Sequence, residues 1–370
     1  MIGNKRPVDS VETPALLIDR RKMMRNIGMM ADFAHKAEVV LRPHFKTSKM
    51  VEVARLQFEA GAVGFTCATM AEVQNLLSAG FQDIFWAHAP VSAGKALFVA
   101  EANRTARLAA GIDSVALAKV LSKAAVEVET EIPLLLEIDT GMARTGILAS
   151  EATSVAGQIS ALPGIVLEGV YAHEGELASL KGERSELFAA GVAAARSLVG
   201  VAHELRGAGH AINVVSVGST PGWESAPSVH GVTEARAGTY VFFDANQLRL
   251  GSALAHQCAV TVLTTVTSAH DEKRCVIDAG IKAMSSDRSN RGDSFGLVTA
   301  ADGAIEEKIL FERAYEEHGI LTGAGTEALA VGSRLRVIPN HACGVVNMFS
   351  RVHVVEGGNV IDVWNPVGRH

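Results

Sequence analysis

Apolar runs and alanine-rich stretches alternate along the first two thirds of the chain, and this alternation constrains the fold more than any other feature. The runs have the length of buried strands, and the stretches between them carry apolar residues at helical spacing. Eight strand–helix units over roughly 200 residues match the size of a (β/α)8 TIM barrel. We therefore expect an α/β fold with strands at residues 39–46, 62–68, 83–89, 105–112, 132–139, 165–173, 212–220 and 234–244.

A doubly wound open sheet would show the same alternation of strands and helices. Such a sheet usually carries a Gly-x-Gly-x-x-Gly turn after its first strand, and no such turn follows the first run of this chain. The count of eight strands also favours a barrel. We expect the barrel to occupy residues 15–250.

The chain changes character after Gly251. The segments that follow are short, rich in Val, Thr and Ile, and lack long helical intervals. The expected strands are residues 260–268, 274–281, 309–311, 334–338 and 345–349, and then a hairpin formed by 352–355 and 360–364. A β-rich second domain at residues 251–370 follows from this pattern, joined by residues 1–14.

The charge and composition of the chain exclude several classes of function. A net charge of -6 and a pI near 6.1 give no broad attraction to nucleic acid. No run approaches the ~20 apolar residues that a membrane span requires. The four cysteines are far apart and form no disulfide-dense pattern, which favours a reducing, cytoplasmic compartment. We expect neither a nucleic-acid nor a membrane partner.

Residues 41–49, Leu-Arg-Pro-His-Phe-Lys-Thr-Ser-Lys, place basic side chains on an otherwise apolar strand. If the segment is extended, Arg42, His44 and Lys46 share one face. Burying three basic groups is costly unless an anion meets them. One interpretation is a phosphorylated aldehyde cofactor with Lys46 as its imine-forming amine. The other is a solvated basic edge strand.

The ends of the seventh and eighth expected strands look like two halves of an anion site. Glycines there let an anion approach the backbone, and hydroxyl groups add donors. Barrel enzymes often hold phosphate at these two loops. Turn glycines with capping hydroxyls explain either loop alone, but the pair favours a phosphate site. The candidate residues are Ser219 and Thr220 in the first loop, and Gly238, Thr239 and Tyr240 in the second.

Further polar residues follow the fifth and sixth expected strands. Arg144 lies in a loop, where it could sit beside a phenolate oxygen or form a salt bridge to Glu137 or Asp139. Tyr171 and His173 share one face of a strand, which suits contact with a flat ring. A core tyrosine and a hydrogen-bonded core histidine fit the same pattern.

A histidine and a cysteine lie two residues apart in the second domain. If residues 339–343 (Pro-Asn-His-Ala-Cys) are extended, His341 and Cys343 point the same way and offer ligands for an ion such as zinc. The spacing alone is a weak signal, because a His-x-Cys pair arises easily by chance. Two protein ligands leave coordination positions open, which suits a metal that binds substrate.

Taken in order, these motifs resemble the fold type III pyridoxal phosphate enzymes. Within them the chain looks like the branch that contains D-threonine aldolase, eukaryotic-type D-serine dehydratase and D-threo-3-hydroxyaspartate dehydratase. The likeness covers nearly the whole chain. The motifs are Arg-Pro-His-x-Lys-Thr-x-Lys at 42–49, Glu-x-Asp-x-Gly-x-x-Arg-x-Gly at 137–146, Tyr-x-His-Glu at 171–174, Gly-Ser-Thr-Pro at 218–221, Gly-Thr-Tyr at 238–240 and Pro-Asn-His-Ala-Cys at 339–343.

The resemblance implies an alanine-racemase-like barrel followed by a β domain, usually working as a homodimer. It implies that Lys46 is the Schiff-base lysine, that Arg144 contacts the phenolic oxygen of pyridoxal phosphate, and that Tyr171 lies near the pyridine ring. His173 is a further candidate contact because it shares a strand face with Tyr171. The residues that would surround the phosphate or its approach are Ser219, Thr220, Gly238, Thr239 and Tyr240. His341 and Cys343 would hold a divalent metal (Zn, Mn, Mg or Co).

The activity that the resemblance implies is a lyase acting on D-3-hydroxy amino acids. Aldolases of the branch tend to pair the histidine with aspartate, whereas the dehydratases use cysteine. Cys343 therefore favours β-elimination of water to a 2-oxo acid and ammonia, with retro-aldol cleavage to glycine and an aldehyde as the alternative. A racemase is disfavoured, because it would leave the metal pair unexplained.

Two hypotheses lie outside this group of lyases. A non-catalytic pyridoxal phosphate carrier would resemble the barrel alone, so the second domain with His341 and Cys343 argues against it. A class I aldolase would use Lys46 without any cofactor, and a colourless purified protein would favour it.

Overall fold

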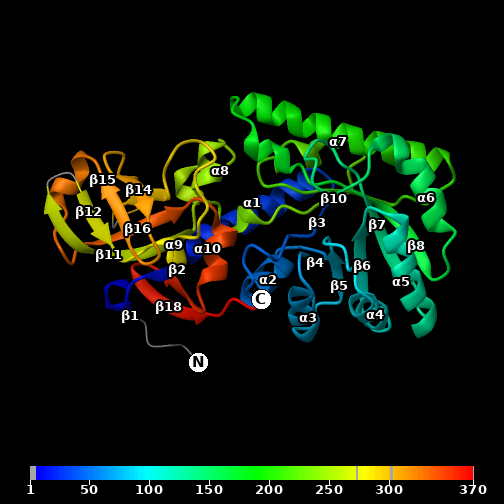
Figure 1. The fold of residues 1–370 in the computed structure, drawn as a ribbon, viewed down its shortest axis with the longest axis horizontal. Coiled ribbons are helices and arrows are strands. Elements are labelled where there is room, and N and C mark those ends of the chain that lie inside the picture. Colours follow the sequence, from blue (N-terminus) through cyan, green and yellow to red (C-terminus); the bar gives the residue numbers. More distant parts are fainter. Residues whose placement is uncertain (1–5, 272–273, 301–302, 370) are drawn as a thin grey trace. The chain divides into compact units, whose positions relative to one another are not determined.

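The computed structural model describes residues 6–271, 274–300 and 303–369. The chain forms two compact units (Figure 1). We name them the barrel unit, made of Met29–Lys46, Val53–Gly238 and the end of the chain from Val367, and the β unit, made of the chain up to Gly28, Thr47–Glu52 and Thr239–Pro366.

Eight parallel strands make the core of the barrel unit. A bridge between His44 and Thr66 joins the two ends of the row, so the sheet closes on itself. This confirms the predicted barrel and its eight strands. In the order of pairing they are β3 (Val40–Leu41), β10 (Glu234–Ala235), β9 (Val214–Val217), β8 (Ile165–Tyr171), β7 (Ile132–Glu137), β6 (Arg107–Ile112), β5 (Asp83–Trp86) and β4 (Phe65–Cys67).

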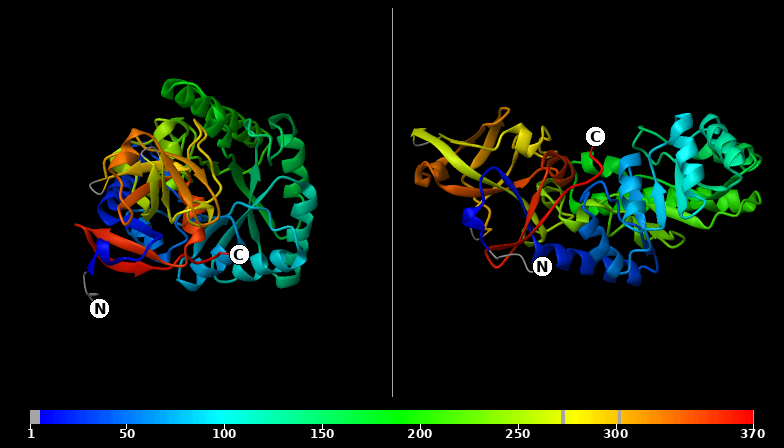
Figure 2. Two further views of the ribbon diagram at one scale, coloured as in Figure 1. Left: turned by 60° about the vertical axis from the view of Figure 1, so that its left-hand side comes forward. Right: turned by 90° about the horizontal axis from the view of Figure 1, so that it is seen from below.

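Helices lie outside the ring of strands (Figure 2). Three of them begin with a hydroxyl cap, because Thr69, Ser92 and Ser114 each accept a hydrogen bond from the backbone N–H three residues later. The helices between the barrel strands are α2 (Val51–Glu59), α3 (Met70–Ser78), α4 (Ala93–Ala102), α5 (Val115–Val128), α6 (Ala152–Ser160) and α7 (Arg184–Gly207), preceded by α1 (Arg20–Lys36).

Among the described residues, α7 is the one helix whose length and apolar composition would allow it to cross a membrane. It contacts β8 and β9, and its residues Leu187, Leu198 and Leu205 are buried. A helix that packs on a barrel sheet can have the same length and composition, and α7 packs on β8 and β9 in this way.

The β unit is built on a ten-stranded, mostly antiparallel sheet. The predicted hairpin is confirmed, because β17 and β18 pair antiparallel. Its main path runs β1 (Arg6–Pro7), β18 (Asn359–Trp364), β17 (Val352–Glu356), β2 (Ala15–Asp19), β11 (Val260–Asp271), β12 (Arg274–Ile277), β15 (Gly319–Thr322) and β14 (Leu310–Ala314), with β16 (Arg334–Pro339) on β11 and β13 (Gly296–Thr299) on β16. Three short helices, α8 (Ala245–Arg249), α9 (Ile281–Met284) and α10 (Ala342–Met348), complete the unit.

The strand β2 begins at Ala15 and pairs with β11 and β17 of the β unit. β2 therefore lies in the β unit, and the first strand of the barrel unit along the chain is β3. The first four side chains of β2 are apolar and buried, and the fifth is Asp19. A short apolar run of this kind fits either sheet, so its partner is decided by tertiary packing.

Two local predictions are wrong. Residues 345–349 were expected to form a strand, but α10 covers Ala342–Met348. Val345 and Val346 are buried there, and burial of a short apolar run does not distinguish a strand from a helix. The strand expected at 234–244 ends at Ala235, and Thr239–Val241 form a 3-10 turn instead.

Candidate active site

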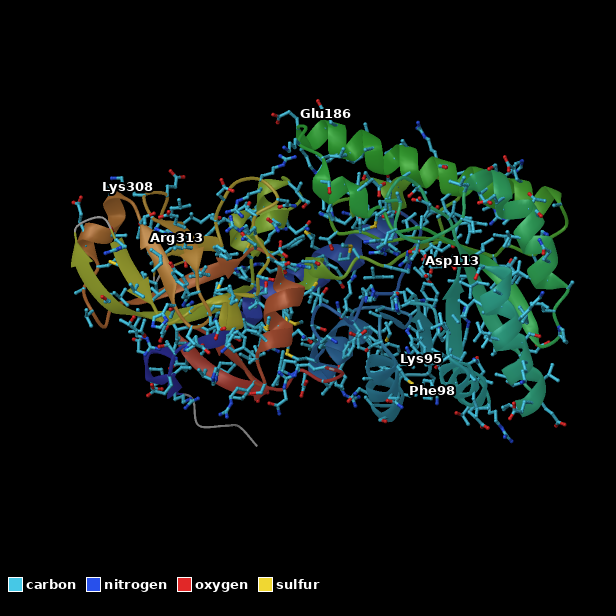
Figure 3. All side chains as sticks on the ribbon, viewed as in Figure 1. Lys95, Phe98, Asp113, Glu186, Lys308 and Arg313 are labelled. Atoms are coloured by element: carbon cyan, nitrogen blue, oxygen red, sulfur yellow. The ribbon has the colours of Figure 1, made fainter. Side chains whose placement is uncertain are left out.

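A pocket of about 400 Å³ lies at the carboxyl ends of the barrel strands. This is within the size range of small-molecule sites. Lys46 lies in the turn that follows the bridge at His44, and its side chain is half-buried. Asp113, labelled in Figure 3, follows β6 and lines the same pocket. The titratable residues in the lining are His44, Lys46, His88, Asp113, Glu137 and Arg144.

Arg42 does not belong to this pocket, contrary to the expectation that it shares a face with Lys46. Its side chain is buried, and its guanidinium contacts Glu234 (Nε–Oε2 2.7 Å) and Asp83 (Nη1–Oδ1 2.8 Å). Burial alone would lower the pKa of Arg42, but the two carboxylates outweigh it and raise the pKa. The anions that meet this basic group are the protein's own.

Arg144 is carried by a loop that Asp139 shapes. The Asp139 carboxylate accepts hydrogen bonds from the backbone N–H groups of Gly141 (2.9 Å) and Ala143 (3.1 Å). The Gly141 hydrogen bond is the main cause of the lowered pKa of Asp139. The loop leaves the Arg144 side chain exposed at the rim of the pocket.

Tyr171 lies in the barrel interior, 2% exposed, with its hydroxyl 3.0 Å from Glu137 Oε2 and 3.0 Å from the carbonyl oxygen of Ala87. Burial, followed by the Glu137 carboxylate, raises its pKa. Thr145 donates to the other oxygen of Glu137. Tyr171 thus supports Glu137 and Ala87, which both line the pocket.

His173 and Glu174 form hydrogen bonds to the backbone carbonyl and the backbone N–H of Gly218. His173 Nδ1 lies 2.6 Å from the carbonyl oxygen of Gly218, and Glu174 accepts from the Gly218 N–H at 3.2 Å. Burial and then the Lys46 charge lower the pKa of His173 to about 3, so its ring is neutral and Nδ1 carries the proton that Gly218 accepts. Sequence reasoning missed the role of Glu174, although it directly follows His173.

The loop after Gly218 carries Ser219 and Thr220, both buried. Ser219 Oγ accepts from the N–H of Gly222 at 3.3 Å, which keeps the loop compact. Because the N–H of Gly218 is bound by Glu174, the donors left to an anion are those of later residues. Gly238 is also buried, at the end of the barrel unit.

In the β unit, His341 and Cys343 lie at the start of α10 and not on an extended strand as expected. His341 occupies the N-cap position, and its Nδ1 lies 3.1 Å from Asp287 Oδ2. The Cys343 sulfur lies 3.1 Å from the Thr47 hydroxyl and 3.6 Å from the Thr239 hydroxyl. The structure thus brings three distant segments of the chain together around this pair.

The surroundings of His341 are anionic. The Cys343 thiolate is the largest cause of its raised pKa, followed by a hydrogen bond to Asp287 and the charge of the buried Asp244, against a lowering by burial. Tyr240, next to Thr239, is fully buried. Anionic neighbours of this kind favour the positively charged form of the imidazole.

The comparison with known families decides where this chain belongs. The alanine racemase N-terminal domain family matches residues 18–246, and a putative serine dehydratase domain matches residues 259–355. The chain belongs to the alanine racemase N-terminal domain family. Its relatives with a serine dehydratase domain are fold type III pyridoxal phosphate enzymes, so the predicted resemblance is confirmed.

Curated relatives align along nearly the whole chain. The sequence is 35% identical to D-threo-3-hydroxyaspartate dehydratase of Delftia sp. (strain HT23), over 96% of this chain and 97% of the relative. It is 29% identical to D-threonine aldolase of Arthrobacter sp, over 97% of this chain and 93% of the relative.

Solved structures of the family superpose closely on this one. The Delftia dehydratase gives a TM-score of 0.91 at 33% identity, covering 97% of this chain and 98% of that chain. D-threonine aldolase from Filomicrobium marinum gives 0.88 at 25% identity, covering 98% and 96%. The dehydratase has also been solved with a cysteine replaced by alanine, a form described as metal-free.

Proposed function

We propose that the chain is a pyridoxal phosphate- and divalent metal-dependent lyase acting on D-3-hydroxy amino acids, and that loss of water to give a 2-oxo acid and ammonia is its favoured reaction. The observation that carries the proposal is the pocket with Lys46 in its wall, at the strand ends of a chain 35% identical to a D-threo-3-hydroxyaspartate dehydratase.

The barrel pocket fits the cofactor. It offers a primary amine at Lys46 and a guanidinium at Arg144 within a space of about 400 Å³. Pyridoxal phosphate would supply an aldehyde for amines and an electron-withdrawing ring. We assign Lys46 to the aldehyde and Arg144 to the phenolic oxygen. The phosphate or its approach is assigned to Ser219, Thr220, Gly238, Thr239 and Tyr240.

The pair in the β unit fits a divalent ion. Imidazole and thiolate are borderline and soft ligands that suit zinc, and the Asp287 carboxylate beside His341 adds negative charge to the site. Among the described residues, no group of three or more His, Cys, Asp or Glu side chains could hold a metal. We therefore assign to His341 and Cys343 an open site, where a bound ion would supply a Lewis acid for the substrate hydroxyl.

The remaining residues prepare the site for proton transfer. In the proposal, Lys46 Nζ removes the proton from Cα of the substrate. The neutral ring of His173 adds no third positive charge beside Lys46 and Arg144. The Tyr171 hydroxyl forms a hydrogen bond to Glu137 and so holds the Glu137 side chain in the pocket wall.

Dehydration and retro-aldol cleavage are distinguished by their products. We would supply D-serine, D-threonine and each D-3-hydroxyaspartate isomer separately, with and without chelator, and assay 2-oxo acid against glycine. Dehydration is supported by Cys343 and by the higher identity to the dehydratase than to the aldolase. Glycine as the main product would contradict it, and a Lys46→Ala variant that retains turnover would contradict both reactions.

A homodimer and a cytoplasmic location are parts of the same proposal. The resemblance to fold type III enzymes supports the dimer, and the sequence spacing of the cysteines supports a reducing compartment. Light scattering on the purified holoenzyme and cell fractionation test the two statements separately.

A further inference from the structure

The carboxylate of Asp287 lies within hydrogen-bond distance of the His341 ring. The Nδ1–Oδ2 distance is 3.1 Å, and the contact joins two loops 54 residues apart in sequence. A carboxylate accepts only, so the His341 proton is placed on Nδ1. When a metal displaces the other ring proton, Nε2 is then the nitrogen that offers a lone pair.

The carboxylate is itself held in place. Ser285 Oγ donates to the same Asp287 oxygen at 3.1 Å and accepts from the Asp287 N–H at 3.2 Å. The amide of the buried Asn340 donates to the Asp287 carbonyl oxygen at 3.1 Å, and Arg249 fixes that amide by donating to its oxygen at 2.7 Å. Ser285 and Asn340 thus contact Asp287 directly, and Arg249 supports it through Asn340.

The backbone of α10 leaves room for this acid. A Cβ atom on Gly344 would lie 2.6 Å from Asp287 Oδ2 and 3.0 Å from Ser285 Oγ. Real Cβ atoms essentially never come within 3.0 Å of such groups. A side chain at position 344, one residue after Cys343, would therefore force the Asp287 carboxylate to shift.

Resting on the metal site of the proposed function, we propose that Asp287 is a positioning residue for the metal, which fixes the tautomer and ring orientation of His341 so that Nε2 and the Cys343 sulfur address one divalent ion. Histidine ligands of metals in proteins almost always donate their other ring N–H to such a partner. A surface salt bridge without this role would be worth little and would leave metal affinity unchanged.

The test compares zinc affinities of the cofactor-loaded enzyme after its metal has been removed with chelator. Zinc is titrated calorimetrically into wild type, Asp287→Asn and Asp293→Asn. Asp293 is an exposed acid on the same segment, so its variant matches the change in charge. We expect Asp287→Asn to bind zinc about 10- to 100-fold more weakly, and the control to bind as wild type does. Equal affinity for all three proteins would overturn the proposal.

Two further measurements separate the possible causes. Ser285→Ala removes the hydrogen bond to Asp287 without touching His341, and we expect it to weaken zinc binding in the same direction. With cobalt as probe, the thiolate charge-transfer band should keep its energy in Asp287→Asn and need more metal to saturate. A saturated spectrum that shows one coordination position fewer or exchanged in Asp287→Asn would make Asp287 a direct ligand and overturn the positioning role.

The outcome for wild type distinguishes this inference from the proposed function. If wild type binds no zinc or cobalt, the metal-dependent function fails, and the role of Asp287 fails with it. If wild type binds metal and Asp287→Asn binds equally well with a normal cofactor spectrum, only the inference fails.

Discussion

The buried ion pair between Arg42 and Glu234 offers a sharp test of how the barrel is closed. Arg42 follows β3 and Glu234 lies on β10, so the pair ties the first strand to the last. Glu234 also accepts from the Ser216 hydroxyl at 2.7 Å. The perturbation is Glu234→Gln, which keeps the shape and an acceptor oxygen but removes the charge.

The magnitude follows from what Arg42 retains. Asp83 still faces its guanidinium, so the charge is not left wholly unpaired. Replacing a charge-assisted hydrogen bond by a neutral one costs about 1–2 kcal/mol, and removing a buried partner altogether costs about 3–5 kcal/mol. We expect a loss near 2 kcal/mol for Glu234→Gln, hence a fall in Tm of about 4–8 °C for a unit of this size, and about twice that for Glu234→Ala.

The assay is thermal and urea unfolding of the holoenzyme, followed by cofactor absorbance and far-ultraviolet dichroism. Glu356→Gln is the control, because Glu356 pairs with exposed Arg20 and Arg21 and should cost less than about 1 kcal/mol. Cofactor affinity should be unchanged in both variants. If Glu234→Gln instead weakens cofactor binding and leaves unfolding unaltered, Arg42 serves the cofactor and the structural reasoning is refuted.

Three further perturbations have definite expected outcomes. Burial raises the pKa of Glu174 from 4.5 to about 7. The contribution of this protonated carboxyl to the free energy of unfolding is therefore complete below pH ~4.5 and is lost as pH rises through 7. Glu174→Gln should flatten this part of the curve of stability against pH, as measured by urea unfolding. Gly344→Ala should displace the Asp287 carboxylate and lower zinc affinity in calorimetry, with an unchanged cofactor spectrum. Gly111→Ala puts a Cβ 2.4 Å from the Tyr171 hydroxyl, and it should cost about 1–3 kcal/mol in unfolding and weaken cofactor binding.

The barrel could be predicted because buried parallel strands are written as continuous apolar runs. The run at β7 shows this most clearly, since all six of its residues are buried. Prediction of a strand from an apolar run fails where the run is short. Residues 345–349 have the composition of a strand, yet Val345 and Val346 pack as one side of α10.

The residues of the candidate site could be named from the sequence more readily than their partners. Lys46 and Arg144 stand at strand ends and line one pocket, as the barrel rule predicts. The meeting of Arg42 with Glu234 depends on a contact between residues 192 apart, and periodicity carries no information about such a distance. The sequence therefore predicts the basic cluster, but it does not predict that Arg42 pairs with Glu234 and Asp83 rather than with a cofactor.

Asp244 explains why the metal pair in particular escaped a geometric prediction. This fully buried carboxylate accepts from the N–H of Gln247 at 2.9 Å, which caps α8, and from the N–H of Ala342 at 3.0 Å, which begins α10. One side chain thus sets the starts of two helices that lie 98 residues apart, and Ala342 is the residue between His341 and Cys343. This buried acid holds the backbone between His341 and Cys343 at the point where α10 begins, with His341 extended and Cys343 in the first turn of the helix. The sequence contains that acid immediately after the last apolar run of the barrel, with nothing in its neighbours to connect it to residue 342.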